Sequence, residues 1–496
     1  MRSRKTLEAP FPVIPAAAGC IVLFAIFAWG PNLALLVLSL VTLFAGAWLC
    51  WRPGEPGIAL FLFGYQWIQA SIAIFVANMN GISINQMAQL STANMADATA
   101  LTFLGLIVLF GAFRLAAGPP MTHLVKRART QAQYVRPRQL LIAYAVASVG
   151  AFVLTYLSSF SEGIRQPLLA FASIKEAIFF IIAFVGLVKG GSFRWLFYGV
   201  FALEFLISLQ GYFSSFQTVF IYTFIAAIAA NIRLGAMKVA LLGAFVAFAV
   251  LLASVWSAVK TDYRAYLNGG TGQQIVTVSW ADAVGTLFDM ALQVDGEDLA
   301  DGVDKLSRRL TYVEFFGATL NNVPKNTPHT DGELWLKALV HPFTPRLFFP
   351  NKPITDSSAE TNKYSGIRVA GWETGTQISI GYFGESYIDF GPWGMFFPLA
   401  LYGAVAGATY RRVLQLPVFS GLIGFGLSLP LLMGANHLGS ETIKIVGAFV
   451  ITAIAIFITH RFAGAFVQVL VFGRQNQRRM LRSGDITRSI HPRSAS

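Results

Sequence analysis

Long apolar segments recur along almost the whole chain, and they constrain the fold more than any other feature of the sequence. An α-helix needs about 20 mostly apolar residues to cross a bilayer, and by that rule the chain holds about 12 predicted spans. They fall at residues 13–29, 31–50, 57–78, 98–117, 139–158, 170–188, 195–211, 215–232, 238–257, 391–410, 416–434 and 444–460. Only 12% of the residues are charged, against about a quarter in a soluble domain. We therefore predict an all-α polytopic membrane protein.

The spacing of these spans divides the chain into four parts. We expect the first nine spans in residues 1–257, a large and partly helical loop in 258–390, the last three spans in 391–461 and a basic tail in 462–496. The basic start (MRSRK) before an apolar run resembles a signal peptide, but more spans follow at once, so we interpret it as a retained first helix. Cys20 and Cys50 lie in or beside spans, which argues against a disulfide framework or a cysteine metal site.

Three helices are expected inside the large loop, because apolar residues recur there at helical spacing. They are predicted at residues 279–292, 299–321 and 331–340. Thr330 or Asp331 is the expected N-cap of the third helix.

Basic residues gather in alternate loops. They are Arg2, Arg4, Lys5, Arg52, Lys126, Arg127, Arg129, Arg136, Arg138, Lys189, Arg194, Arg233, Lys238, Arg411, Arg412 and the arginines after residue 473. Cytoplasmic loops carry an excess of Lys and Arg, so both termini are expected in the cytoplasm and the large loop in the periplasm of a bacterial inner-membrane protein. This distribution accounts for the net charge of +13 without nucleic acid as a partner.

The segment PRLFFPNKP in the large loop carries Arg346 and Lys352, with prolines at 345, 350 and 353 that restrict its backbone. Arg binds phosphate through two parallel hydrogen bonds, and Lys acts as a compact charge. A rigid pair of cations beside a membrane would suit a lipid-linked phosphate or diphosphate. The competing interpretation is a structural turn whose cations meet lipid head groups.

Glu385 and Asp389 lie in GYFGESYIDFGPWG, just before the tenth predicted span. In a helix they would share a face, four residues apart. A carboxylate at this position would act as general base toward a sugar hydroxyl, or it would cap a helix N-terminus. We favour the base for Glu385 and the cap for Asp389.

The remaining candidate residues have two interpretations each. Arg264 is a second diphosphate contact or an interface anchor, Arg165 is a further cation of the external loops, and Arg368 is a substrate contact or part of a solvated loop. His341 is a base or a structural histidine, and no metal-binding pattern lies near it. Glu204, inside a span, either serves a proton path or pairs with Arg114 or a backbone donor.

The layout of many spans with one large external loop late in the chain resembles the Wzy-type O-antigen and exopolysaccharide polymerases. PRLFFPNKP followed by GYFGESYIDFGPWG is similar to the passage from loop to span in that family. Some members carry R-x10-G motifs, and none of Arg165, Arg264, Arg346 and Arg368 is followed by glycine at that spacing.

The resemblance implies a GT-C-like membrane glycosyltransferase. A growing glycan on undecaprenyl diphosphate would be transferred to the terminal sugar of another lipid-linked repeat unit, with no cofactor or metal. Glu385 or His341 would take the proton of the acceptor hydroxyl, and Arg346, Lys352, Arg264, Arg165 and Arg368 would bind diphosphate or substrate. The bilayer and a chain-length-regulating co-polymerase are the implied partners.

Two other functions stay open at this point. A ligase of the related WaaL type would use the same donor and depend on a periplasmic histidine, for which His341, His329 or His437 could stand. A lipid-linked oligosaccharide flippase or transporter would show inverted repeats and charges at mid-membrane depth.

Overall fold

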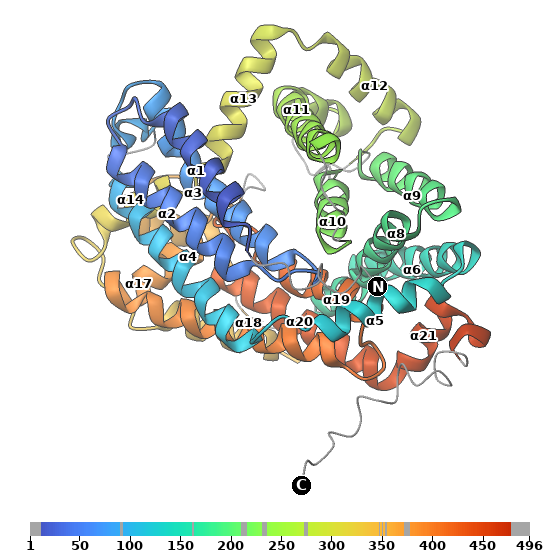
Figure 1. Cartoon of the computed structure of the whole chain (residues 1–496). Helices are drawn as coiled ribbons and strands as arrows, with labels where there is room; N and C mark the ends of the chain where they lie inside the picture. Colours follow the sequence, from blue (N-terminus) through green and yellow to red (C-terminus); the bar gives the residue numbers. More distant parts are fainter. Residues whose placement is uncertain are drawn as a thin grey trace.

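Helices make up all the regular secondary structure of the part of the chain that the structure describes (Figure 1). This computed structural model describes residues 11–89, 93–160, 163–209, 216–230, 236–271, 276–346, 348–349, 351–352, 355–371 and 377–477. The predicted tail beyond residue 477 lies outside the described residues, as do Pro350 and Pro353. The part of the predicted tail before it contains a helix, α21 (Gly464–Phe472).

Every predicted span coincides with a helix of the structure. These helices are α1 (Val13–Phe27), α2 (Leu33–Cys50), α3 (Ile58–Met79), α4 (Met95–Ala117), α6 (Pro137–Ser158), α8 (Ile174–Lys189), α9 (Ser192–Leu209), α10 (Phe216–Ala229), α11 (Ala236–Leu267), α18 (Phe396–Gln415), α19 (Leu422–Met433) and α20 (Thr442–Ile458). Within the described residues, six helical segments are long and apolar enough to cross a membrane. In the part of the chain that the structure describes, the protein is therefore all-helical with six candidate membrane-spanning helices, and the larger number of crossings stays a prediction.

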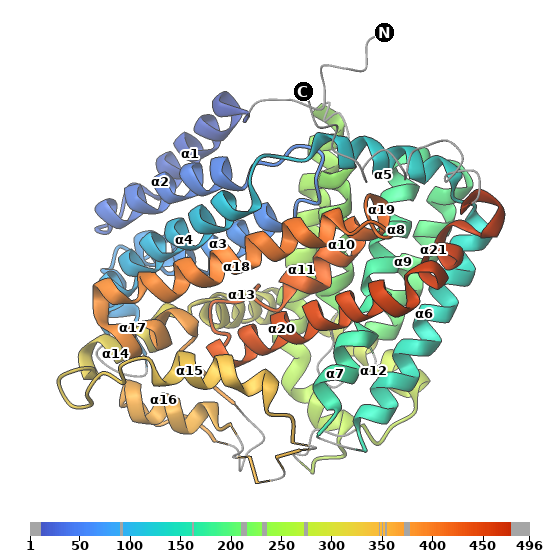
Figure 2. The ribbon, with the colours of Figure 1, turned by 90° about the horizontal axis from the view of Figure 1, so that it is seen from below.

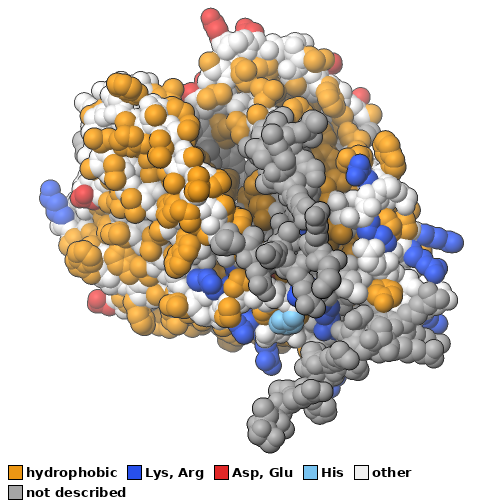
Figure 3. All heavy atoms as spheres, in the orientation of Figure 1, with side chains coloured by type: hydrophobic (Ala, Val, Ile, Leu, Met, Phe, Trp, Pro, Cys, Tyr) orange, Lys and Arg blue, Asp and Glu red, His pale blue; other side chains and the backbone are white. Residues whose placement is uncertain are grey.

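Two of these six segments join shorter elements. One runs from α7 (Arg165–Ala172) into α8, and the other from α20 through a turn of π-helix (Thr459–Ala463) into α21. On the face that Figure 3 shows, apolar side chains cover broad areas over α1–α4, as expected of a surface in contact with lipid.

Among the described helices, α4 and α18 share the most extensive contact. Gly403 and Gly407 make it possible, because a Cβ at either residue would lie 2.2–2.3 Å from the carbonyl oxygens of Leu109 and Phe113. Small residues that let helix backbones approach are typical of helix pairs in membranes.

The ends of the helical bundle differ in character. At one end lies α5 (Thr122–Tyr134), which carries Lys126, Arg127 and Arg129 (Figure 2). At the opposite end lie four helices of the predicted loop, α14 (Val313–Asn322), α15 (Glu333–Val340), α16 (Ser357–Ser365) and α17 (Tyr382–Gly394), together with α7. The basic helix and these loop helices thus lie at opposite ends, and the side of a membrane that each faces stays a prediction.

The large loop confirms two of the predicted helices, one of them with a different N-cap, and corrects the third. The helix at 279–292 is α12 (Trp280–Gln293), with Ser279 as N-cap. The single helix expected at 299–321 is wrong: α13 (Gly296–Leu310) ends at Thr311, and α14 begins two residues later. Because α13 packs on α11 while α14 packs on α4, one straight helix could not serve both contacts.

The start of α15 also differs from the prediction. Its N-cap is Gly332, whose φ of 95° favours glycine, rather than Thr330 or Asp331. The capping carboxylate comes from Asp389 on α17, which is 1% exposed and accepts hydrogen bonds from the backbone N–H groups of Leu334 (3.1 Å) and Trp335 (2.9 Å). Asp389 is thus a helix cap as expected, but its partner is distant in sequence.

Glu385, one turn earlier on α17, caps a different helix. Its Oε2 accepts a hydrogen bond from the backbone N–H of Thr442, the first residue of α20, at 2.8 Å. The two carboxylates of α17 therefore satisfy donors at the N-termini of two other helices, donors that have no partner within their own helix.

We expect Asp389→Ala to lower the free energy of unfolding by about 3 kcal/mol, since it leaves two buried N–H donors without an acceptor. Thermal unfolding in detergent measures the change. Asp304→Ala, which removes an exposed carboxylate paired with Arg308, should leave the melting temperature almost unchanged. Equal melting temperatures for Asp389→Ala and the wild type would contradict this role.

Candidate functional site

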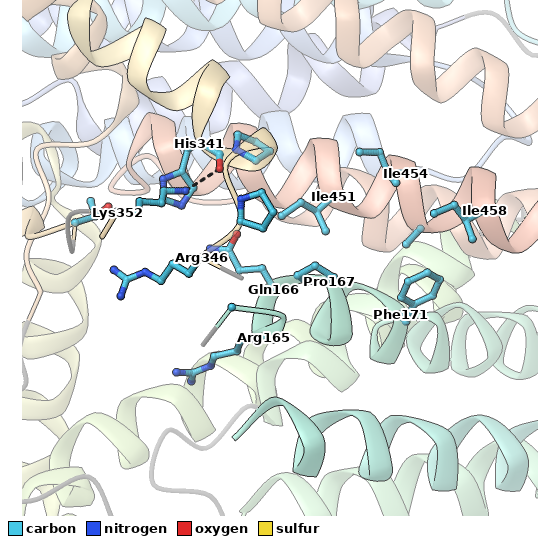
Figure 4. A pocket seen from close by; sticks show the side chains of 15 residues that line it. Arg165, Gln166, Pro167, Phe171, His341, Arg346, Lys352, Ile451, Ile454 and Ile458 are labelled. Atoms are coloured by element: carbon cyan, nitrogen blue, oxygen red, sulfur yellow. Dashed lines mark hydrogen bonds between the residues drawn. The ribbon is translucent and has the colours of Figure 1, made fainter. Parts of the chain in front are cut away.

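A cavity of about 460 Å³ lies between α7, α20 and the segment that follows α15 (Figure 4). That segment begins with a short 3-10 helix, η2 (His341–Phe343). The cavity is lined by Gly163, Arg165, Gln166, Pro167, Phe171, His341, Pro342, Pro345, Arg346, Lys352, Thr355, Ile451, Ile454, Ala455 and Ile458. It thus brings together four of the predicted site residues: Arg165, His341, Arg346 and Lys352.

One end of the cavity is basic. Arg165 opens α7, His341 opens η2, and Arg346 and Lys352 follow in the proline-rich turn. Figure 4 shows the side chains of Arg165, Arg346 and Lys352 together at this end. Among the lining residues none is acidic, so the charge at this end is suited to an anion.

Lys352 also holds the turn in shape. Its ammonium donates hydrogen bonds to the backbone carbonyls of His341 (2.8 Å) and Thr344 (3.0 Å). These bonds close the chain between residues 341 and 352 into a compact turn, which places His341 and Arg346 on the same cavity.

The other end of the cavity is apolar. Ile451, Ile454 and Ile458 form a row along α20, and Phe171 of α7 lies across from it (Figure 4). Residues three and four apart share a helix face, so the row is a continuous hydrocarbon surface about 10 Å long at 1.5 Å of rise per residue. Ile454 and Ile458 are both partly exposed.

Burial and neighbouring cations lower the pKa of His341 to about 4; the cations are Lys352, Lys337 and Arg346. Burial, and then Arg346, also lowers the pKa of Lys352. His341 is therefore a neutral imidazole near pH 7, able to accept a proton or a hydrogen bond. A bound anion would offset the cations and raise the pKa of His341 again.

Glu385 does not line this cavity. It borders a separate, narrow and buried space together with Glu441 and Glu360. Burial, with a smaller contribution from the charge of Glu441, raises the pKa of Glu385 to about 8. The structure thus separates the two residues predicted as bases, His341 and Glu385.

Two predicted arginines lie apart from the cavity. Arg264 is in the last turn of α11, beside Tyr263, which belongs to a small apolar core of α10, α11 and α12. Arg368 is exposed in the chain that follows α16. Neither lines the basic cavity.

The other ionisable candidates have structural partners. The Nδ1 of His329 lies 3.0 Å from the carbonyl oxygen of Ile388, and the ring of His437 packs edge-on against Tyr312. Glu204 pairs with Lys175 at 2.8 Å and accepts from Tyr144, so its partner is not Arg114.

Metal binding finds no support in the geometry of the described residues. Among them, no group of three or more His, Cys, Asp or Glu side chains is placed to hold a metal ion. A metal-independent reaction stays a prediction.

The sequence did not single out the apolar half of this cavity. Phe171, Ile451, Ile454 and Ile458 stand in apolar runs with nothing to distinguish them from other lipid-facing residues. Gln166 had one usable signal, its position directly after Arg165 in the loop before the predicted span at 170–188.

The fold and the cavity define an all-helical protein with candidate membrane-spanning helices and an amphiphilic pocket, basic at one end and apolar at the other. The chain belongs to a family described as a domain of unknown function (DUF8712), whose model matches residues 70–416. The match includes the four basic residues of the cavity and ends before its isoleucine row. Neither the curated proteins nor the solved structures contain a match to the chain.

The low pKa of His341 predicts a pH effect on stability. The unfolded chain binds a proton here below about pH 6.5 and the folded chain only below about pH 4, so stability should fall as the pH drops through that window. His341→Gln should flatten this part of the profile of melting temperature against pH. An identical profile in both proteins would contradict the assignment.

Glu385 predicts the opposite trend. Because its pKa rises from 4.5 to about 8 on folding, ionisation should reduce stability as the pH rises between those values. Glu385→Gln keeps the hydrogen-bond acceptor for Thr442 and removes the ionisation. We expect the variant to melt above the wild type at pH 8, with the difference shrinking toward pH 4.5. A variant that melts below the wild type at pH 8 would refute this.

Proposed function

We propose that the protein is a polysaccharide polymerase that transfers an undecaprenyl-diphosphate-linked glycan onto the terminal sugar of another lipid-linked repeat unit, at the periplasmic face of a bacterial inner membrane. The observation that carries the proposal is the amphiphilic cavity. A lipid diphosphate has a compact anionic group joined to a long hydrocarbon chain, and the cavity offers a matching surface to each part.

The basic end would hold the diphosphate. Arg165 and Arg346 border the same cavity from two separate elements, so they could grip the group from two sides. Each guanidinium can donate two parallel hydrogen bonds to phosphate. The row formed by Ile451, Ile454 and Ile458 would receive the first isoprene units of the lipid.

The reaction needs a base and a stabilised leaving group. The acceptor hydroxyl attacks the anomeric carbon, and the bond from that carbon to the diphosphate oxygen breaks with its electron pair going to the diphosphate. The neutral imidazole of His341 takes the hydroxyl proton, and the arginines stabilise the negative charge that develops on the diphosphate. We favour His341 over Glu385 as the base, because Glu385 is buried as a helix cap away from the cavity.

Deletion of the gene, followed by gel analysis of lipid-linked and surface glycans, tests the proposal. A polymerase predicts collapse of the ladder to a single repeat unit that still reaches the periplasm. Long chains that persist on undecaprenyl diphosphate without reaching their final acceptor would indicate a ligase instead. Single units that accumulate on the cytoplasmic side would indicate a flippase or transporter.

Arg346→Ala should reproduce the collapse in the complemented strain. Hydrogen bonds to charged groups contribute about 1.5–3 kcal/mol, so we expect about 10- to 100-fold weaker binding of the lipid diphosphate. Arg368→Ala is the matched control, since Arg368 is an exposed arginine of the same loop outside the cavity. Full ladders from both variants at equal protein levels would count against the cavity as the active site.

A further inference from the structure

The short helix α15 has two apolar faces, although it belongs to a segment predicted to be periplasmic. Leu334, Trp335 and Ala338 are buried against the rest of the protein. On the outer side, Leu336 is 62% exposed, Leu339 and Val340 are exposed, and Phe343 of η2 is 65% exposed. The spacing of these four residues places them on one side of a helix.

The turn after η2 extends this surface. Phe348 is 74% exposed and Phe349 is exposed as well. Two nearby lysines have partners away from these apolar side chains. Lys337 pairs with Glu360 on α16, and Lys352 donates hydrogen bonds to backbone carbonyls. The exposed apolar residues of α15, η2 and the turn that follows are here named the α15 face: Leu336, Leu339, Val340, Phe343, Phe348 and Phe349. A patch of this kind on a folded protein marks a contact with a partner or a membrane.

The α15 face adjoins apolar surfaces of predicted spans on both sides. At its start, a Cβ on Gly332 would lie 3.0 Å from the ring of Phe390. From Phe390 an exposed stripe continues along α17 and α18 through Trp393, Phe397, Leu401 and Val405. At its other end, Pro342 of η2 shares the cavity with Ile451, Ile454 and Ile458 of α20, and Figure 2 shows α15 beside α17 and α20.

We propose that the α15 face is immersed in the lipid bilayer, so that α15 and η2 lie at the boundary between head groups and hydrocarbon. Lipid fits better than a protein partner, because the face continues into exposed apolar stripes of α18 and α20 that a membrane would cover together. Helices that lie at this boundary carry Phe and Leu on the side that faces lipid and Lys and Arg on the other side, and Phe343, Phe348 and Phe349 are close in sequence to Arg346 and Lys352.

This placement has a consequence for the cavity. Its basic end would lie at head-group depth, and its isoleucine row would lie in the hydrocarbon. An anionic lipid could then enter sideways from the bilayer without leaving it. The inference does not depend on the proposed transfer reaction, since it concerns only the position of α15 in the membrane.

Spin labels on single cysteines test the inference in the full chain. Cys20 and Cys50 are first replaced by serine and alanine, and the protein is reconstituted in vesicles of phosphatidylethanolamine and phosphatidylglycerol. Labels at Leu336→Cys, Val340→Cys and Phe343→Cys are compared with a lipid control, Phe397→Cys, and an aqueous control, Asn326→Cys at an exposed residue. The readout is collision of the label with oxygen, which concentrates in lipid, and with a water-soluble nickel chelate.

We expect the three labels to collide with oxygen more often than the label at Asn326 does, and to be shielded from the nickel chelate as the label at Phe397 is. Collision with nickel at the level of Asn326 would overturn the inference, because the face would then be in water. Shielding from both reagents would overturn it as well and would point to a protein covering the face. Three positions keep the test decisive if one variant fails to fold.

Discussion

Two buried carboxyl groups on the short helix α17 hold in place the two helices that border the cavity, α15 with the basic turn after it and α20 with the isoleucine row. Asp389 caps α15, which leads into η2 and His341, and Glu385 caps α20, which carries the isoleucine row. A buried carboxyl group is costly unless it is hydrogen-bonded, and a helix N-terminus offers N–H groups that have no partner within their own helix. Because both carboxylates sit one turn apart on α17, the relative placement of the basic and apolar walls depends on this single element.

Buried and partly buried ionisable residues also join helices elsewhere in the bundle. Lys175 meets Glu204 between α8 and α9, and Arg52 meets Glu55 in a buried pair whose guanidinium also bonds to the carbonyl of Gly118 at the end of α4. Ionisable groups at such positions are expensive unless paired, so they serve to join helices. The lining of the cavity, by contrast, combines Arg165, Arg346 and Lys352 with no acidic residue.

Hydropathy was enough to predict where the helices lie, because the apolar runs needed for a bilayer are long and distinct. It was not enough where two distant segments meet. The N-cap of α15 could not be predicted locally, since Asp389 reaches it from 57 residues beyond Gly332. The end of helix α13 at Thr311 could not be predicted either, because it depends on α13 packing on α11 while α14 packs on α4. Each of the four basic residues of the cavity was predicted as a candidate site residue on its own. That they line one cavity, and that Glu385 does not line it, depends on tertiary structure.

Lys352 contributes both to the positive charge of the cavity and to the conformation of the turn that borders it. The ammonium that contributes to the basic end is the same group that ties the carbonyls of His341 and Thr344 together. A neutral substitute would change the electrostatic potential and release the turn at once. Substitution of Lys352 would therefore combine a loss of affinity with a loss of local order, whereas Arg165, which lines the same cavity from α7, offers a second position at which to measure the effect of charge.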